Sequence, residues 1–267
     1  MKNLQIPKFC LWMLMLSISA TLSAQGGASL FVVVDFMKVE SQEHAAYLEV
    51  EQEIWKPMHQ ERIREGIIVG WFLYAVEFSG SSDEYNYVAI TLYDNAEKLE
   101  NPWMADLPGK VHPGMKPEEI MKRTYESREN VKSHLCYSIA TAPEIPLEKP
   151  AAYMQVNYMK VEPLMRTEYE QLETEIWFPI HSEAIRSGHT AGWSLWSMLF
   201  PRGDGLPYQY LTLNAFSEYT YAFELDFSIP FSNIHPDKDY AETQAKTVQT
   251  RTIVRTELWD LIDYVIK

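Results

Sequence analysis

The sequence predicts an α+β fold made of two tandem copies of one domain. Two observations lead to this fold class: a long internal repeat, and alternating strand-like and helix-like hydrophobic patterns inside each repeat. The segment from Glu53 to Leu73 recurs from Glu175 to Leu195, 122 residues later, and 12 of the 21 aligned positions are identical. This spacing is far longer than the repeats of solenoids and propellers. We therefore expect two copies of a whole domain.

The match continues on both sides of that segment and sets the domain limits. Near the ends of the two copies, Arg128 faces Arg251 at nearly the same spacing. One copy therefore covers residues 29–140 and the other residues 151–267. Residues 141–150 contain three prolines and no apolar period, so we expect a short, fairly stiff linker between the copies.

The first copy begins with a strand pattern followed by a long helical one. Residues 30–39 are apolar and rich in valine, which predicts a buried strand. Residues 43–65 place their apolar side chains on one helical face. Gly66 follows directly, at a position where glycine commonly ends a helix.

The remainder of the copy predicts a hairpin, two more helical segments and a last strand. Residues 69–78 and 85–93 alternate in hydrophobicity around a turn rich in serine and glycine, which is typical of a hairpin. Helical patterns follow at 95–104 and 117–130. Residues 131–140 return to a strand pattern.

The predicted element order in each copy is β-α-β-β-α-β, the ferredoxin-like arrangement of a four-stranded antiparallel sheet with both helices on one face. The other face needs a cover, and the second copy, which ends in a strand at 253–265, provides one about a pseudo-two-fold axis. On this element order the chain resembles the dimeric α/β-barrel superfamily, which includes antibiotic-biosynthesis monooxygenases, NIPSNAP-type proteins and haem-handling enzymes. The resemblance implies a pseudo-dimeric α/β barrel in one polypeptide, and it carries over no catalytic residue.

Residues 1–24 have the layout of a secretory signal peptide, with two lysines, an apolar run too short to favour a membrane span, and small residues at the end. We expect cleavage after Ala24 and a periplasmic or secreted protein. Cleavage leaves Cys136 as the only cysteine, so no internal disulfide is possible. The formal net charge of −14 argues against nucleic acid and anionic membranes as partners. Because the fusion supplies the two-fold partner, we expect a monomer.

A proline lies inside the long predicted helix of each copy, at Pro57 and Pro179. An interior proline removes a hydrogen bond and frees the carbonyl four residues earlier, here that of Glu53 or Glu175. One interpretation is a bend over a twisted sheet, or a second helix that starts with proline. The other is a helix opened to line a pocket.

The same helix has a stripe of three side chains at four-residue spacing, and both copies share it: Glu51, Trp55 and His59, and Glu173, Trp177 and His181. Residues four apart stack on one helical face. In the structural interpretation the two rings cover the edge between helix and sheet while the acid stays in water. In the functional one His59 or His181 is a catalytic base that titrates near neutral pH and faces a cavity walled by Trp55 or Trp177.

Six further residues recur as candidate ligand-binding groups: His112, His235, Trp71, Trp193, Tyr87 and Tyr210. The two histidines each precede a helical segment and either brace a loop or contact a ligand. Aromatic residues on strands are usual core partners, and they also suit a pocket for a flat apolar molecule. The copies differ where Ile67-Ile68 becomes His189-Thr190, which allows two unlike pockets.

Known catalytic and metal motifs are absent from the sequence, including HExxH, CxxC, a G-x-S-x-G elbow and glycine-rich phosphate loops. We expect no metal and no cofactor, with haem as the alternative. Three functions stay open: an exported protein that binds a small molecule between helix and sheet, which we favour; a cofactor-independent monooxygenase acting on an aromatic substrate; and haem binding or breakdown with a histidine ligand. The resemblance implies the last two.

Overall fold

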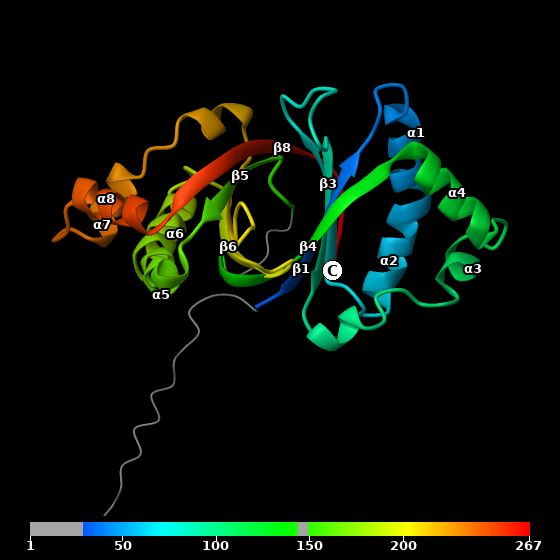
Figure 1. Ribbon diagram of the computed structural model, residues 1–267, viewed down its shortest axis with the longest axis horizontal. Helices are drawn as coiled ribbons and strands as arrows, with labels where there is room; N and C mark the ends of the chain where they lie inside the picture. Colours follow the sequence, from blue (N-terminus) through cyan, green and yellow to red (C-terminus); the bar gives the residue numbers. More distant parts are fainter. Residues whose placement is uncertain (1–28, 144–148) are drawn as a thin grey trace, which may run out of the picture.

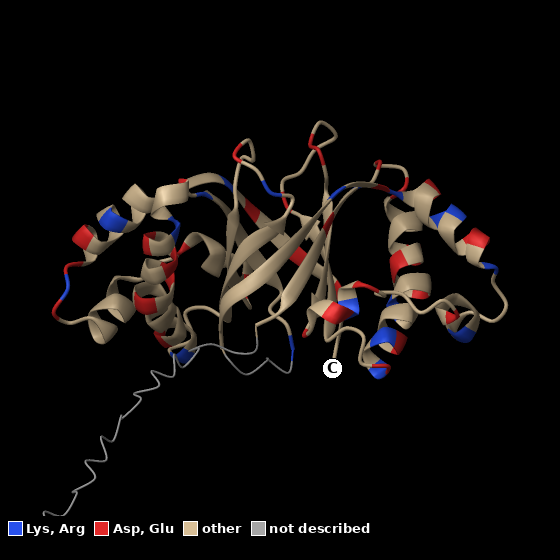
Figure 2. Ribbon diagram, turned by 60° about the horizontal axis from the view of Figure 1, so that its bottom comes forward, with Lys and Arg blue, Asp and Glu red and all other residues tan. Residues whose placement is uncertain are grey.

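The computed structural model describes residues 29–143 and 149–267. The predicted signal peptide lies outside these residues, and so does the middle of the predicted linker, residues 144–148. Eight strands form a closed antiparallel barrel, and helices flank it on both sides (Figure 1). Charged side chains are dense on the outer helices and sparse on the barrel strands (Figure 2). None of the described helices has the length and apolar character needed to cross a membrane.

The first half runs from β1 to β4. Its elements are β1 (Phe31–Lys38), α1 (His44–Glu49), η1 (Val50–Trp55), α2 (Lys56–Arg64), β2 (Gly70–Val76), β3 (Tyr87–Tyr93), η2 (Ala96–Leu99), α3 (Leu107–Val111), α4 (Pro117–Ser127) and β4 (Glu129–Ala142).

The second half follows the same order from β5 to β8. Its elements are β5 (Tyr153–Lys160), η3 (Pro163–Met165), α5 (Arg166–Gln171), η4 (Leu172–Trp177), α6 (Phe178–Arg186), β6 (Gly192–Phe200), β7 (Tyr210–Phe216), η5 (Tyr219–Phe223), α7 (Ser228–Ile234), α8 (Tyr240–Thr250) and β8 (Thr252–Ile266).

The strands follow the order β1-β3-β2-β8-β5-β7-β6-β4 around the barrel. Each half supplies four neighbouring strands, and the long last strand of each half joins the two sheets. Residues 252–260 of β8 pair with β5 of their own half, and residues 259–266 pair with β2 of the other half. In the same way β4 pairs first with β1 and then with β6. The predicted strand at 131–140 is therefore longer in the structure, because its end closes the barrel.

The barrel interior is a packed hydrophobic core. Side chains alternate between the two faces of a strand, so Val32, Val34 and Phe36 of β1 point into the barrel while Phe31 and Val33 pack under the helices. Because the interior is filled by side chains, the space available for a ligand lies at the helix-covered and hairpin sides.

One carboxylate is buried in this core. Glu257 of β8 accepts hydrogen bonds from the hydroxyls of Tyr85 and Tyr158 at 2.7 and 2.8 Å and from the indole of Trp259 at 2.8 Å. The guanidinium of Arg255 lies 2.6 Å from it. A buried acid is tolerated when its oxygens have partners, and these four donors provide them.

The predicted helix at 43–65 is one continuous rod that contains a π-helical turn just before Pro57. The backbone N–H of Lys56 bonds to the carbonyl of Glu51, five residues back, and α2 begins at Lys56. The proline thus falls in the first turn of α2, where its missing N–H costs little. Gly66 ends the helix with φ +71°, a conformation that glycine adopts freely. The same features recur at η4 and α6.

The prediction of a helix at 95–104 is wrong. Only a short 3-10 turn forms at Ala96–Leu99, and α3 follows at Leu107–Val111, where none was expected. Pro102 disfavours helical geometry in the residue before it, which ends the segment early. Pro108 then falls in the first turn of α3, the position that proline prefers.

Candidate functional site

The two candidate catalytic histidines lie between the long helix and the sheet, each against the tryptophan that begins the second strand of its half. The ring of His59 stacks on Trp71 at a centroid distance of 4.6 Å, and His181 stacks on Trp193 at 4.7 Å. Their exposed fractions are 4% and 6%. Burial lowers the pKa of His59 well below its usual value and that of His181 to about 3. Both imidazoles are therefore neutral near pH 7.

Trp55 and Trp177 connect the long helix of each half to the helix that precedes its last strand, α4 or α8. The indole N–H of Trp55 donates to the hydroxyl of Thr124 in α4 at 3.0 Å, and that of Trp177 donates to Thr247 in α8 at 2.8 Å. These matched bonds hold the two helices of each half together on the outside of the sheet.

The expectation that the acids of the stripe stay in water is wrong. Glu51 and Glu173 are 3% and 4% exposed. Burial raises the pKa of each carboxyl to about 7, against the opposing effect of Arg128 or Arg251. The Nε of Arg128 lies 3.2 Å from Glu51 Oε1. In each half a second helix, α4 or α8, packs beside the long helix. It covers the side of the long helix next to the core-facing stripe, and this side carries the acid.

His112 and His235 brace the π-helical turns. The Nε2 of His112 lies 3.0 Å from the carbonyl oxygen of Ile54, and that of His235 lies 3.2 Å from the carbonyl oxygen of Ile176. The carbonyl is an acceptor only, so each Nε2 carries the proton. The prolines predicted that the carbonyls of Glu53 and Glu175 would be free. The histidines contact instead the carbonyl of the following residue, Ile54 or Ile176.

Tyr87 and Tyr210 occupy matching strand positions but have different surroundings. The hydroxyl of Tyr87 lies 3.2 Å from Nδ1 of His44. The hydroxyl of Tyr210 donates to Glu170 at 2.5 Å, and Tyr210 borders an open cavity. Of the ten candidate catalytic and ligand-binding residues, Tyr210 is the one that lines this cavity.

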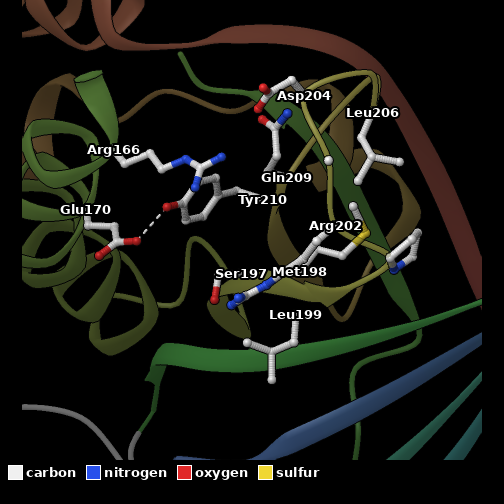
Figure 3. A pocket seen from close by; sticks show the side chains of 12 residues that line it. Arg166, Glu170, Ser197, Met198, Leu199, Arg202, Asp204, Leu206, Gln209 and Tyr210 are labelled. Carbon is white, nitrogen blue, oxygen red and sulfur yellow. Dashed lines mark hydrogen bonds between the residues drawn. The ribbon is translucent and has the colours of Figure 1, made fainter. Parts of the chain in front are cut away.

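This cavity has a volume of about 410 Å³ and lies between α5 and the hairpin that joins β6 to β7 (Figure 3). Its lining combines charged, polar and apolar side chains. The residues are Arg166, Glu170, Ser197, Met198, Leu199, Pro201, Arg202, Gly203, Asp204, Leu206, Gln209 and Tyr210.

The hairpins of the two halves differ, which explains why the cleft opens in the second. In the first half Lys38 donates to the carbonyls of Ser81 and Asp83 at 3.0 and 2.7 Å and holds the hairpin against β1. Lys160 occupies the matching position in β5 and makes no such bond among the described residues. The second hairpin also carries the one-residue insertion and Gly203 at φ +151°. A loop of different shape and without the lysine clamp leaves the cleft open.

Two guanidinium groups reach the cleft from opposite sides, Arg166 from the first turn of α5 and Arg202 from the hairpin (Figure 3). Neither forms a salt bridge within the described part of the chain. Burial and the neighbouring Glu170 carboxylate raise the pKa of Tyr210, so its hydroxyl stays protonated and holds that carboxylate. No sequence motif marks these residues. Their signal is the difference between copies, because Arg166 and Glu170 face His44 and Leu48.

A second cavity of about 210 Å³ lies at the other end of the long helix of the same half. It is bounded by the turn after α6 and by the segment between η5 and α7. Its lining residues are Ser187, Gly188, His189, Thr190, Tyr221, Glu224, Leu225, Asp226 and Phe227. The lining includes His189 and Thr190, which replace Ile67 and Ile68 of the first half.

The four candidate histidines contact indole rings or backbone carbonyls. None of His59, His181, His112 and His235 borders either cavity. The first two stack on indoles and the last two hold backbone carbonyls, so we assign no haem ligand. Within residues 29–143 and 149–267, no three histidine, cysteine or acidic side chains gather as metal ligands would.

Solved structures with a similar fold extend over most of the chain. A protein of Lactobacillus acidophilus provisionally named a monooxygenase matches with a TM-score of 0.54 and 8% identity, over 90% of this chain and 96% of its own. A protein of Fusobacterium nucleatum with the same provisional name matches with a TM-score of 0.54 and 10% identity, over 90% and 95%. One provisionally named a chlorite dismutase matches with a TM-score of 0.50 and 9% identity, over 88% and 96%.

The chain has the dimeric α/β-barrel fold. No protein-family model matches the sequence, and no curated protein matches it. At these identities the likeness to solved dimeric α/β barrels shows the fold and not the activity. The function therefore has to be argued from the side chains of this chain.

Proposed function

We propose that this chain is an exported small-molecule-binding protein that holds a small organic anion in the cleft between α5 and the β6–β7 hairpin. Export rests on the signal-peptide layout of residues 1–24. The negative charge of the ligand is inferred from one observation: Arg166 and Arg202 enter the same cleft, and neither has a salt-bridge partner among the described residues. Guanidinium groups bind carboxylates, as they do phosphates, with two parallel hydrogen bonds.

The charge of the whole chain strengthens this argument. A protein with a formal net charge of −14 repels anions in general, so a place where two cations converge is a local exception. Glu170 and Asp204 also line the cleft and balance the charges of the two arginines, which favours a single carboxylate over a more highly charged anion such as a polyphosphate.

The remaining walls indicate a ligand with an apolar body. Met198, Leu199 and Leu206 also line the cleft. The cavity volume of about 410 Å³ falls within the range of roughly 300–1,000 Å³ that is usual for small-molecule sites. An aromatic or branched aliphatic carboxylate has the right size and the right mixture of surfaces.

We also propose that the two halves arose by duplication of one domain and now have different tasks. The paired contacts of the histidines and tryptophans recur in both halves. The two cavities are lined by residues of the second half alone. This pattern fits one half that supports the fold and one that binds the ligand.

Calorimetric titration with benzoate tests the proposed function. We expect Arg166→Gln and Arg202→Gln each to weaken benzoate binding by about ten-fold, because each removes a charged hydrogen bond of about 1.5 kcal/mol or more. Lys238→Gln removes one positive charge from an exposed loop of the same half and is the matched control. The neutral analogue benzamide should bind more weakly than benzoate. Equal affinities for benzoate and benzamide would refute an anion site.

A cofactor-independent monooxygenase is the alternative function, and fold likeness to proteins with that provisional name is its support. Its candidate bases are His59 and His181. An effective general base has a pKa near the working pH, whereas burial holds the pKa of both imidazoles far below it. The alternative requires that His181→Ala abolish turnover of an aromatic substrate while the protein still folds. For this reason we favour binding over catalysis.

A further inference from the structure

The second cavity of the second half contains a buried hydroxyl without a hydrogen-bond partner. Thr190 is 6% exposed, and its Oγ1 has no partner within the described structure although the residue lines the cavity. The matching residue of the first half is Ile68, which is 1% exposed and part of the hydrophobic core. A buried hydroxyl that lacks a partner is unfavourable, so its presence in a cavity indicates a group that completes it.

The first half has a buried cation near the corresponding end of its long helix. Arg62, fully buried, bonds to His59 Nδ1 at 3.0 Å and to the hydroxyl of Tyr93 at 2.7 Å. Its guanidinium also lies over the ring of Trp103 at 3.9 Å. The first half therefore already holds an organic cation between a histidine, a hydroxyl and an aromatic face.

The second half lacks that cation. Ala184 stands where the first half has Arg62, and Nδ1 of His181 has no partner within the described structure. The ring of Phe227 lies 4.8 Å from His181 and forms a wall of the cavity. The second half therefore has two unpartnered polar atoms near the position of the lost side chain, and of these two residues Thr190 lines the cavity while His181 does not.

The rim of the cavity is acidic. Glu224 and Asp226 both line it, and the backbone N–H of Ser228 donates to Asp226 at 2.8 Å, which favours the charged carboxylate. Tyr221 and Phe227 add two aromatic rings. His189 also faces the cavity, with its Nδ1 2.8 Å from the hydroxyl of Ser187. Carboxylates with aromatic faces form the usual environment of a bound ammonium group.

We propose that this cavity is a second binding site, specific for a small organic ammonium ion. The carboxylates of Glu224 and Asp226 attract the ion, the rings of Tyr221 and Phe227 contact its apolar part, and Thr190 accepts a hydrogen bond from its N–H. The site has the opposite charge preference from the arginine cleft and lies at the other end of the long helix.

Titration of the mature chain with benzylammonium chloride and with its neutral counterpart benzyl alcohol tests this proposal. We expect benzylammonium to bind and Glu224→Gln and Asp226→Asn each to weaken it at least five-fold. Asp237→Asn, which removes one exposed acid in the loop after α7, is the matched control and should bind as the wild type does. Thr190→Val should weaken binding as well, and the two carboxyl variants keep the test valid if that variant does not fold.

Three results would overturn the proposal: no binding of benzylammonium, equal binding of benzyl alcohol, or carboxyl variants that behave like Asp237→Asn. The arginine cleft is tested separately. Arg166→Gln and Arg202→Gln should leave the affinity for benzylammonium unchanged, so failure of one site does not affect the conclusion about the other.

Discussion

The imidazole of His181 lies almost parallel to the indole of Trp193, with ring planes 12° apart and centroids 4.7 Å apart. The matching rings of His59 and Trp71 are 20° apart at 4.6 Å. Both stacks connect the long helix to the first residues of a strand. The same geometry on both sides of the barrel, with deep burial on each, is what a packing role requires. It also keeps each imidazole in its neutral form.

His181 should make the stability of the protein sensitive to acid. Its pKa is about 3 in the folded chain and about 6.5 when unfolded, so the stability it contributes is present above pH 6.5 and is lost as the pH falls towards 3. His181→Phe keeps a ring against Trp193 and removes the titration. Between pH 7 and pH 4 the variant should lose about 3 kcal/mol less unfolding free energy than the wild type. Urea unfolding at both pH values measures this, with His189→Phe as an exposed control. Parallel losses in wild type and variant would contradict it.

Glu173 should have the opposite effect. Burial raises the pKa of its carboxyl to about 7, so the stability it contributes is present below the unfolded value of about 4.5 and is lost as the pH rises through 7. Glu173→Gln cannot ionise. Relative to the wild type it should gain about 2–3 kcal/mol of unfolding free energy between pH 5 and pH 8. Glu168→Gln, which changes an exposed acid of the same helix, should show no such gain. A gain of the same size at pH 5 would mean that the effect does not come from ionisation.

The fold was predictable because its signals are local and occur twice. Strand alternation, the long amphipathic helix and Gly66 each act over a few residues, and the repeat supplies an independent copy of each. The π-helical turn before Pro57 was not predictable, since a proline inside a helical pattern is compatible with several bends. The burial of Glu51 depends on α4, a separate segment that covers the side of the helix next to its apolar stripe.

The cleft could not be predicted from local patterns. Arg166 and Arg202 are 36 residues apart, and only the fold of α5 and the hairpin brings them together. Exposed arginines are common and carry no motif. The conspicuous residues of the sequence, histidine and tryptophan, are the ones that pack the helix-sheet layer. Residues that differ between the two halves, such as Arg166 and Thr190, line the cavities, so such differences are the better indicators of a candidate site.

Arg62 should be replaceable by an apolar side chain of similar length. It is fully buried and has hydrogen bonds but no carboxylate partner among residues 29–143 and 149–267, so desolvation of its charge offsets much of what its contacts contribute. We expect Arg62→Met to change the unfolding free energy by less than about 1.5 kcal/mol. Arg62→Ala leaves a cavity and should cost about 3 kcal/mol. Equal losses in the two variants, measured by urea unfolding, would show that the charge itself is required.

Lys38 should be the residue that keeps the first hairpin closed. Its ammonium group donates to the carbonyls of Ser81 and Asp83 in residues 77–86, and charged hydrogen bonds of this kind are worth about 1.5–3 kcal/mol, less where solvent screens them. In Lys38→Met we expect the backbone amides of that hairpin to exchange with solvent about five- to ten-fold faster, because opening a clamped loop is the step that limits exchange. Lys160→Met, at the matching position of the second half, should leave exchange in its own hairpin unchanged. If both variants accelerate exchange alike, Lys160 clamps its hairpin too, and the difference between an open and a closed half must come from the inserted residue and Gly203.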